Sequence, residues 1–100
     1  MADNSETLLR AILATIARQT FPPDRLAGLI APKGNGEKQY RAFNMCDGTR
    51  TQQEIAKALG FDKGNFSRAV TRWIDVGIVI RLGEGRDSTL LHVCPFTPGD

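Results

Sequence analysis

The stretch from Asp62 to Asp75 gathers side chains that can form hydrogen bonds with nucleic acid on one side of a predicted helix. Arg68 can donate two parallel hydrogen bonds to the edge of a guanine, and Asn65 can form a matching pair with an adenine. Gly64 allows a close approach of the backbone, and the N-terminus of a helix favours a phosphate. These residue types therefore indicate contact with duplex DNA; the alternative is an ordinary solvated face.

A helix over residues 62–75 would position these side chains, because its apolar residues recur at the spacing of one buried face. The apolar stripe consists of Phe66, Ala69, Val70, Trp73 and Ile74. At about 100° per residue, polar residues collect on the opposite side, with Ser67 at the margin. The residues of that polar side are Gly64, Asn65, Arg68, Thr71, Arg72 and Asp75.

A second helix is predicted directly before this one. Thr51-Gln-Gln-Glu54 has the form of a capping box, and an apolar run begins at Ile55. Gly60 fits a left-handed C-terminal cap, and Asp62 is well placed to cap the next helix. Two helices joined by a short turn that contains glycine form a helix-turn-helix.

A β-hairpin is predicted after the second helix. Residues 78–82 (IVIRL) and 89–93 (TLLHV) have the length and composition of strands, and a turn rich in glycine and charge joins them. Arg86 at the tip is the best candidate to reach a minor groove, where narrow A-tracts attract cations. Because Glu84 and Asp87 oppose its charge, a merely solvated tip is the alternative reading.

The run over residues 47–93 resembles the winged helix-turn-helix of bacterial and archaeal transcription regulators, most of all the MarR-like group. The matching residues are DGTRTQQEIAKALGFDKGNFSRAVTRWIDVGIVIRLGEG. In this run a Thr-capped EIAKALG helix, a Ser-Arg pair and a Gly-Ile-Val strand follow in the group's usual order. Only residues 95–100 follow the hairpin, where the group usually has long dimerisation helices, and the wing carries Arg86-Asp87 where the group often has Asp before Arg.

The resemblance implies a mainly α-helical fold with a small β-hairpin (α+β), a winged helix-turn-helix preceded by N-terminal helices. It implies a transcription regulator that reads duplex DNA with the recognition helix, residues 62–75, in the major groove. The wing, residues 78–93, would lie on the backbone or in the minor groove. The DNA-binding residues expected on this basis are Arg50, Gln52, Gln53, Lys63, Gly64, Asn65, Ser67, Arg68, Thr71, Arg72 and Arg86.

The N-terminal part, residues 1–46, is predicted to form helices over 3–19, 23–30 and 37–46. Asp3 and Glu6 have the spacing of a capping box at the start of the first helix. That helix carries an apolar stripe, which either packs on the domain's own core or pairs with a second copy of the chain in a homodimer. The residues of the stripe are Leu8, Leu9, Ile12, Leu13 and Ile16.

Length and composition bound the fold and the cellular location. One hundred residues with 41% hydrophobic content suit a single compact domain, in which a winged helix over 47–94 precedes an irregular tail over 95–100. The net charge of +2 is low for a nucleic-acid partner, so the placement of charge has to carry that hypothesis. A signal peptide and a membrane span are not predicted, and the expected location is the cytoplasm.

Cys46 and Cys94 are expected to be reduced thiols rather than a disulfide. Together with His92 they could form a metal or redox site, but neither a CxxC motif nor a paired His spacing supports one. Enzyme chemistry, a metal and a cofactor are therefore not expected. Two other functions stay open: a protein–protein interaction module within a larger complex, and a regulator switched by oxidation of Cys46 or Cys94.

Overall fold

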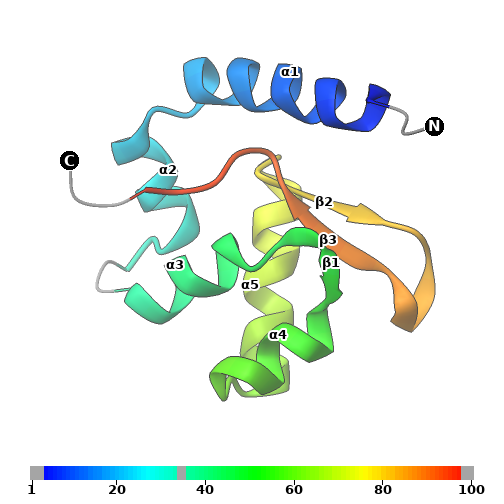
Figure 1. The fold of residues 1–100 in the computed structure, drawn as a ribbon. Coiled ribbons are helices and arrows are strands. Elements are labelled where there is room, and N and C mark those ends of the chain that lie inside the picture. Colours follow the sequence, from blue (N-terminus) through cyan, green and yellow to red (C-terminus); the bar gives the residue numbers. More distant parts are fainter. Residues whose placement is uncertain (1–3, 34–35, 98–100) are drawn as a thin grey trace.

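The structure is a computed structural model that describes residues 4–33 and 36–97. Within these residues, five α-helices surround one face and one end of a three-stranded antiparallel sheet (Figure 1). The helices are α1 (Ser5–Thr20), α2 (Pro23–Ile30), α3 (Glu37–Asn44), α4 (Gln52–Leu59) and α5 (Lys63–Asp75). The strands are β1 (Asp47–Thr51), β2 (Val79–Leu82) and β3 (Thr89–His92), with a 3₁₀ turn η1 (Gly85–Asp87) before β3. The mainly α-helical α+β class predicted from the sequence is confirmed.

The predicted helices are present, with differences at their ends. Helix α1 begins at Ser5 after Asn4, whose side chain makes no capping hydrogen bond. Asp3, the expected cap, lies outside the described residues, and Glu6 pairs with Arg10 instead, at 3.0 Å. Helix α3 ends at Asn44, two residues before the predicted end, because the chain then turns into a strand.

That strand corrects the prediction of a two-stranded hairpin. β1 joins β3 as an antiparallel neighbour, so that β3 lies between β1 and β2. Asp47 pairs with Leu91 and Thr51 with Thr89, and the register shifts between these two pairs. The sequence DGTRT lacks the alternation of apolar and polar residues that marks a half-buried strand, so pairing with β3 determines its conformation.

The apolar stripe of α5 lies at the centre of the core. Phe66, Val70 and Trp73 are almost completely buried, as the helical spacing predicts. The indole Nε1 of Trp73 donates to the carbonyl oxygen of Ile30 at 3.0 Å, which joins α5 to the end of α2. Phe43 of α3 meets the Trp73 ring edge-on at 5.7 Å. This packing fixes which side of α5 is left facing outward.

The chain after β3 is anchored to α3. Phe96 is buried, and its ring lies 4.8 Å from that of Tyr40. The side-chain amide of Asn44 donates to the carbonyl oxygen of Phe96 at 2.8 Å and accepts from its backbone N–H at 2.7 Å. Residues 95–97 therefore belong to the core although they form no regular element, whereas Pro98 lies outside the described residues.

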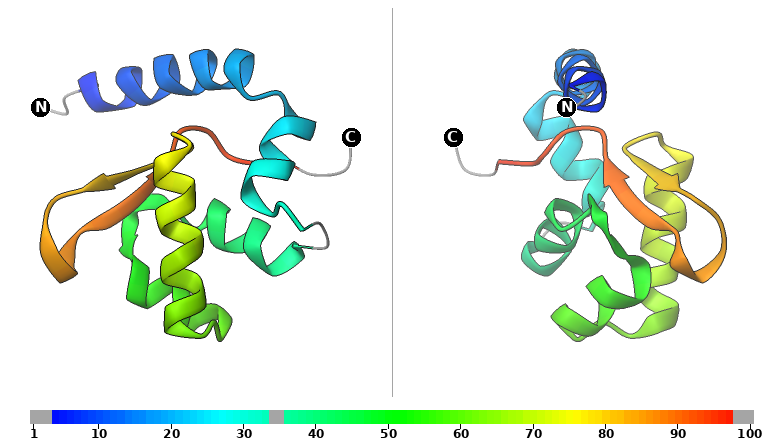
Figure 2. Two further views of the ribbon diagram at one scale, coloured as in Figure 1. Left: turned by 180° about the vertical axis from the view of Figure 1, so that it is seen from behind. Right: turned by 45° about the vertical axis from the view of Figure 1, so that its right-hand side comes forward.

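Helix α1 runs along one end of the molecule, and α4 with the start of α5 forms the opposite end (Figure 1, Figure 2). The side chain of Arg10 lies over β1 at Gly48, where an added Cβ would come within 2.8 Å of the guanidinium. Gly48 also has a φ of +90°, which other residues rarely adopt. Among the helices of the described residues, none is long and apolar enough to cross a bilayer.

Candidate nucleic-acid interface

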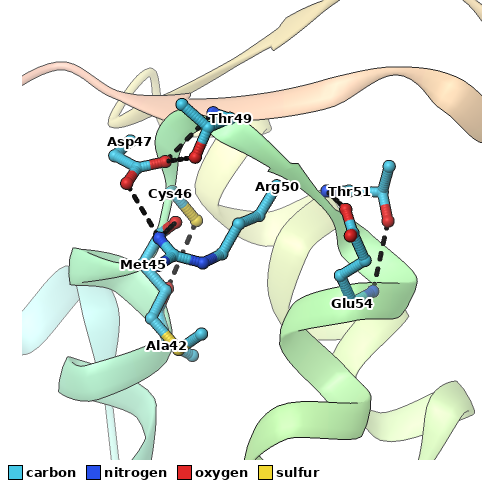
Figure 3. Close-up of polar contacts among 8 residues, drawn as sticks. All are labelled: Ala42, Met45, Cys46, Asp47, Thr49, Arg50, Thr51 and Glu54. Carbon is cyan, nitrogen blue, oxygen red and sulfur yellow. Dashed lines mark hydrogen bonds and ion pairs between the residues drawn. The ribbon is translucent and has the colours of Figure 1, made fainter.

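The start of α4 is fixed by the capping box that the sequence predicts. Thr51 Oγ1 accepts from the backbone N–H of Glu54 at 3.1 Å, and Glu54 Oε1 accepts from the backbone N–H of Thr51 at 2.8 Å (Figure 3). These hydrogen bonds stabilise the carboxylate and lower the pKa of Glu54. Gly60 ends α4 with a φ of +69°, as expected of a left-handed cap. The turn between the helices is therefore determined at both ends.

The N-terminal half of α5 presents an open polar face. Asp62 caps the helix by accepting from the backbone N–H of Asn65 at 3.0 Å. On this face the guanidinium of Arg68 donates to Asn65 Oδ1, which holds the two side chains together. The exposed residues of the face are Lys63, Gly64, Asn65, Ser67, Arg68 and Thr71, all of them expected at the site.

Arg72 differs from these neighbours because its side chain folds back towards α2. The residue is half-buried, and its Nη2 donates to the carbonyl oxygen of Ile30 at 3.2 Å. The same oxygen accepts from Trp73, so two consecutive residues of α5 hold the last turn of α2. The positive charge also lies beside a helix C-terminus, where the macrodipole favours it.

A cleft of about 370 Å³ separates the starts of α4 and α5 from the wing. Ala56 and Phe66 form its apolar floor. Four residues predicted for the site meet at its rim, from three different elements: Gln52, Gln53, Lys63 and Arg86. The wing therefore adds positive charge next to the recognition helix.

Arg81, which was missed in the sequence, also lines this cleft and connects the wing to α4. Its Nη2 donates to Gln52 Oε1 at 3.2 Å, and its Nη1 donates to Ser88 Oγ at 3.1 Å. Ser88 is buried and in turn donates to the carbonyl oxygen of Gly85. The available signal was the alternation within β2, where Arg81 stands between Ile80 and an exposed leucine.

A second groove, of about 810 Å³, lies on the other side of the open face. Asn65, Arg68 and Arg72 line it together with Lys33 and Lys38 of the preceding segments. Lys38 is held at the turn, where it donates to the carbonyl oxygen of Gly60 at 3.1 Å and lies 4.6 Å from the centre of a phenylalanine ring. The two lysines lie far from α5 in the sequence, so spacing alone gave no sign of them.

Comparison with known proteins then assigns the chain to a family. The model of the MarR family matches residues 39–88, half of the chain, from α3 to the end of the turn before β3. The chain belongs to the MarR family. The match confirms the resemblance seen in residues 47–93 and covers both helices of the helix-turn-helix. Searches of curated proteins and of solved structures return no match.

One predicted contact of this MarR-family chain lies apart from the others. Arg50 projects from β1, pairs with Asp47 at 2.8 Å and approaches the carbonyl oxygen of Met45 at 3.5 Å (Figure 3). The hydroxyl of Thr49 donates to the same carboxylate at 2.6 Å. The hydrogen bonds from Thr49 and the charge of Arg50 lower the pKa of Asp47. Arg50 therefore organises the start of the sheet.

The cysteines of this MarR-family chain are free thiols inside the core. Burial, and secondarily the nearby Asp47, raises the pKa of Cys46 to about 12, and its Sγ donates to the carbonyl oxygen of Ala42 at 3.3 Å. Burial also raises the pKa of Cys94. Because the thiolate is the reactive form, both thiols are poor targets for an oxidant. Groups of three metal-binding side chains do not occur within the described residues.

Proposed function

We propose that this winged-helix regulator binds duplex DNA directly, with the N-terminal half of α5 in the major groove and the wing against the neighbouring backbone or minor groove. The observation that carries the proposal is the exposed Asn65–Arg68 pair beside the cationic cleft. A face that the protein's own chain leaves open, with hydrogen-bonding groups at one helical spacing, suits base edges.

In this proposal Arg68 and Asn65 act as one unit. Arg68 donates to Asn65 Oδ1, and an Arg guanidinium has five N–H donors, so it keeps free donors for a guanine. Gly64 lets the helix approach closely, while Lys63 and Ser67 flank the pair. Since the two side chains share a hydrogen bond, the effects of their separate replacement should not add.

Phosphates would be bound around the cleft. Gln52 and Gln53 stand at the start of α4, where orphan backbone N–H groups favour an anion, and Arg86 stands across the cleft on the wing. Arg81 positions Gln52 and adds a further charge. Thr71 lies further along the open face, beside the path of the backbone.

Arg50 and Arg72 stay candidate phosphate contacts on different terms. Arg50 would have to share its guanidinium with Asp47, and Arg72 would have to keep or exchange its hydrogen bond to Ile30. MarR-family regulators generally act as homodimers, and we propose that this chain does so on a site with two-fold symmetry. α1 offers the surface for that pairing.

Mobility shift of duplex DNA across a salt series tests the proposal. Arg68→Ala should weaken binding to a preferred duplex by roughly 5- to 150-fold and relax base preference at one position. Arg25→Ala, which removes an equal charge from the exposed surface of α2, is the matched control and should leave affinity nearly unchanged. If Arg68→Ala and Arg25→Ala behave alike, α5 does not read the bases.

A protein–protein interaction module is the second candidate, because α1 exposes several large apolar residues. It predicts a different result in the same experiment. Electrostatic binding to DNA is strongest at low salt, so lack of any retardation of duplex DNA near 50 mM salt would favour a protein partner over nucleic acid.

A further inference from the structure

Helix α1 has two apolar sides, and only one of them is covered by this chain. Ala17 is buried, and Leu13 packs against the core from the same side. The other side carries Leu8, Ile12 and Ile16, which are 61%, 56% and 58% exposed, with Leu9 beside them at 66%. Soluble proteins seldom leave so continuous an apolar surface in water, so a partner is expected on it.

The charges of α1 show what kind of partner fits. The charged residues of this helix are Glu6, Arg10 and Arg18. At about 100° per residue, each of them lies 120° or more from the axis of the stripe through Ile12. Arg10 pairs with Glu6 and lies over β1 at Gly48, on the packed side. The exposed side is therefore apolar and uncharged, which suits a similar surface and disfavours DNA or a charged segment.

We propose that this side of α1 pairs with α1 of a second copy of the chain, antiparallel, about a two-fold axis at Ile12. The apolar residues are spaced symmetrically about that position, with Leu8 four residues before it and Ile16 four residues after it. An antiparallel pair places Leu8 against the partner's Ile16 and Ile12 against the partner's Ile12. A surface that matches itself in this way forms an isologous interface.

The position of α1 is compatible with binding of DNA by the dimer. α1 lies at the end of the molecule opposite α4 and the start of α5, so pairing leaves the open face of α5 accessible (Figure 1, Figure 2). The inference rests on the proposed function in one respect: it supplies the two-fold symmetry that a palindromic site requires. One face of a single helix is smaller than half of a standard interface of about 1,600 Å², so the dimer should dissociate on dilution.

Disulfide trapping in the full chain tests the pairing and its direction. Ile12→Cys places a thiol on the axis, and mild oxidation should convert most of the protein to a covalent dimer. Leu8→Cys alone and Ile16→Cys alone should stay largely monomeric, whereas a mixture of the two should cross-link. Native Cys46 and Cys94 are buried, so the unmodified chain is the control. Efficient self-linking of Leu8→Cys, or failure of the mixture to link, would overturn the antiparallel pairing.

Sedimentation across a dilution series gives an independent readout. The native chain should change from dimer to monomer on dilution, and Ile12→Glu should be monomeric throughout while retaining the native circular dichroism. Ala11→Glu adds the same charge to an exposed position about 100° away and should still dimerise. A native chain that is monomeric at every concentration would refute the inference. A chain that cross-links at position 12 but retards no DNA would keep the dimer and refute the proposed function.

Discussion

Helices α5 and α1 are both amphipathic, yet they use their two sides in opposite ways. α5 buries its apolar stripe around Trp73 and leaves polar side chains outside. α1 buries little more than Ala17 and leaves its larger apolar residues outside. An apolar stripe thus predicts that a surface will be covered, but it does not predict whether the same chain or another one covers it.

The largest expected difference between the two helices is in folding stability. Phe66→Ala on α5 should lower the free energy of unfolding by about 3 to 5 kcal/mol, because it leaves a cavity beside Trp73. Leu9→Ala on α1 should cost far less in dilute solution, since Leu9 is 66% exposed. Denaturation followed by the fluorescence of Trp73 measures both. Equal losses would mean that α1 is as firmly packed as α5.

A smaller effect is expected where α5 joins α2. Arg72→Ala should lower the free energy of unfolding by about 1 to 3 kcal/mol, because the hydrogen bond to Ile30 involves a charged donor. Arg72→Lys keeps the charge but lacks the planar group. If Arg72 acts through this bond, lysine should recover only part of the stability. Should Arg72→Ala leave stability unchanged and weaken DNA binding alone, its role would be that of a phosphate contact.

The N-terminal caps of the two helices should differ by about 1 kcal/mol. Asp62→Ala removes a cap that accepts from the backbone of Asn65, and such caps contribute about 0.5 to 2 kcal/mol. Asn4→Ala removes a side chain that makes no capping hydrogen bond, so it should cost a few tenths at most. Thermal unfolding of both variants would show the difference, and an equal loss of stability would contradict the capping seen here.

The smallest effect concerns His92, which lies between β1 and α1. Burial, with Arg10 adding to it, lowers the pKa of His92 below 6.5. The unfolded chain then binds more protons than the folded one, so stability is complete above pH 6.5 and decreases as the pH falls below it. His92→Gln should flatten this dependence, measured as the free energy of unfolding on both sides of pH 6.5. An unchanged slope would place its origin elsewhere.

The sequence predicted the helix-turn-helix well because its signals are local. The capping box at Thr51 and Glu54, the glycine cap at Gly60 and the stripe around Trp73 each depend on neighbouring residues. β1 was not predictable in this way. Its pairing with β3 joins residues about forty positions apart, and its polar sequence gives no period.

The site was predictable by position on the helix but not by the reach of its side chains. The spacing placed Arg68 and Arg72 on one face, and only the fold determines that Arg72 turns to Ile30 while Arg68 stays exposed. Long side chains cross the boundary between faces because their flexible stems allow it. Arg81 contributes through a contact between the wing and α4, which depends on tertiary structure.

Selection of bound sequences from random duplex DNA by the native chain tests the central claim most directly. If the open face of α5 reads base edges and α1 pairs two copies, the selected sites should contain an inverted repeat with half-sites about one helical turn apart. The same enrichment should disappear with Arg68→Ala. Sites that remain random after repeated selection, while the protein stays folded, would contradict the assignment of α5 as a recognition helix.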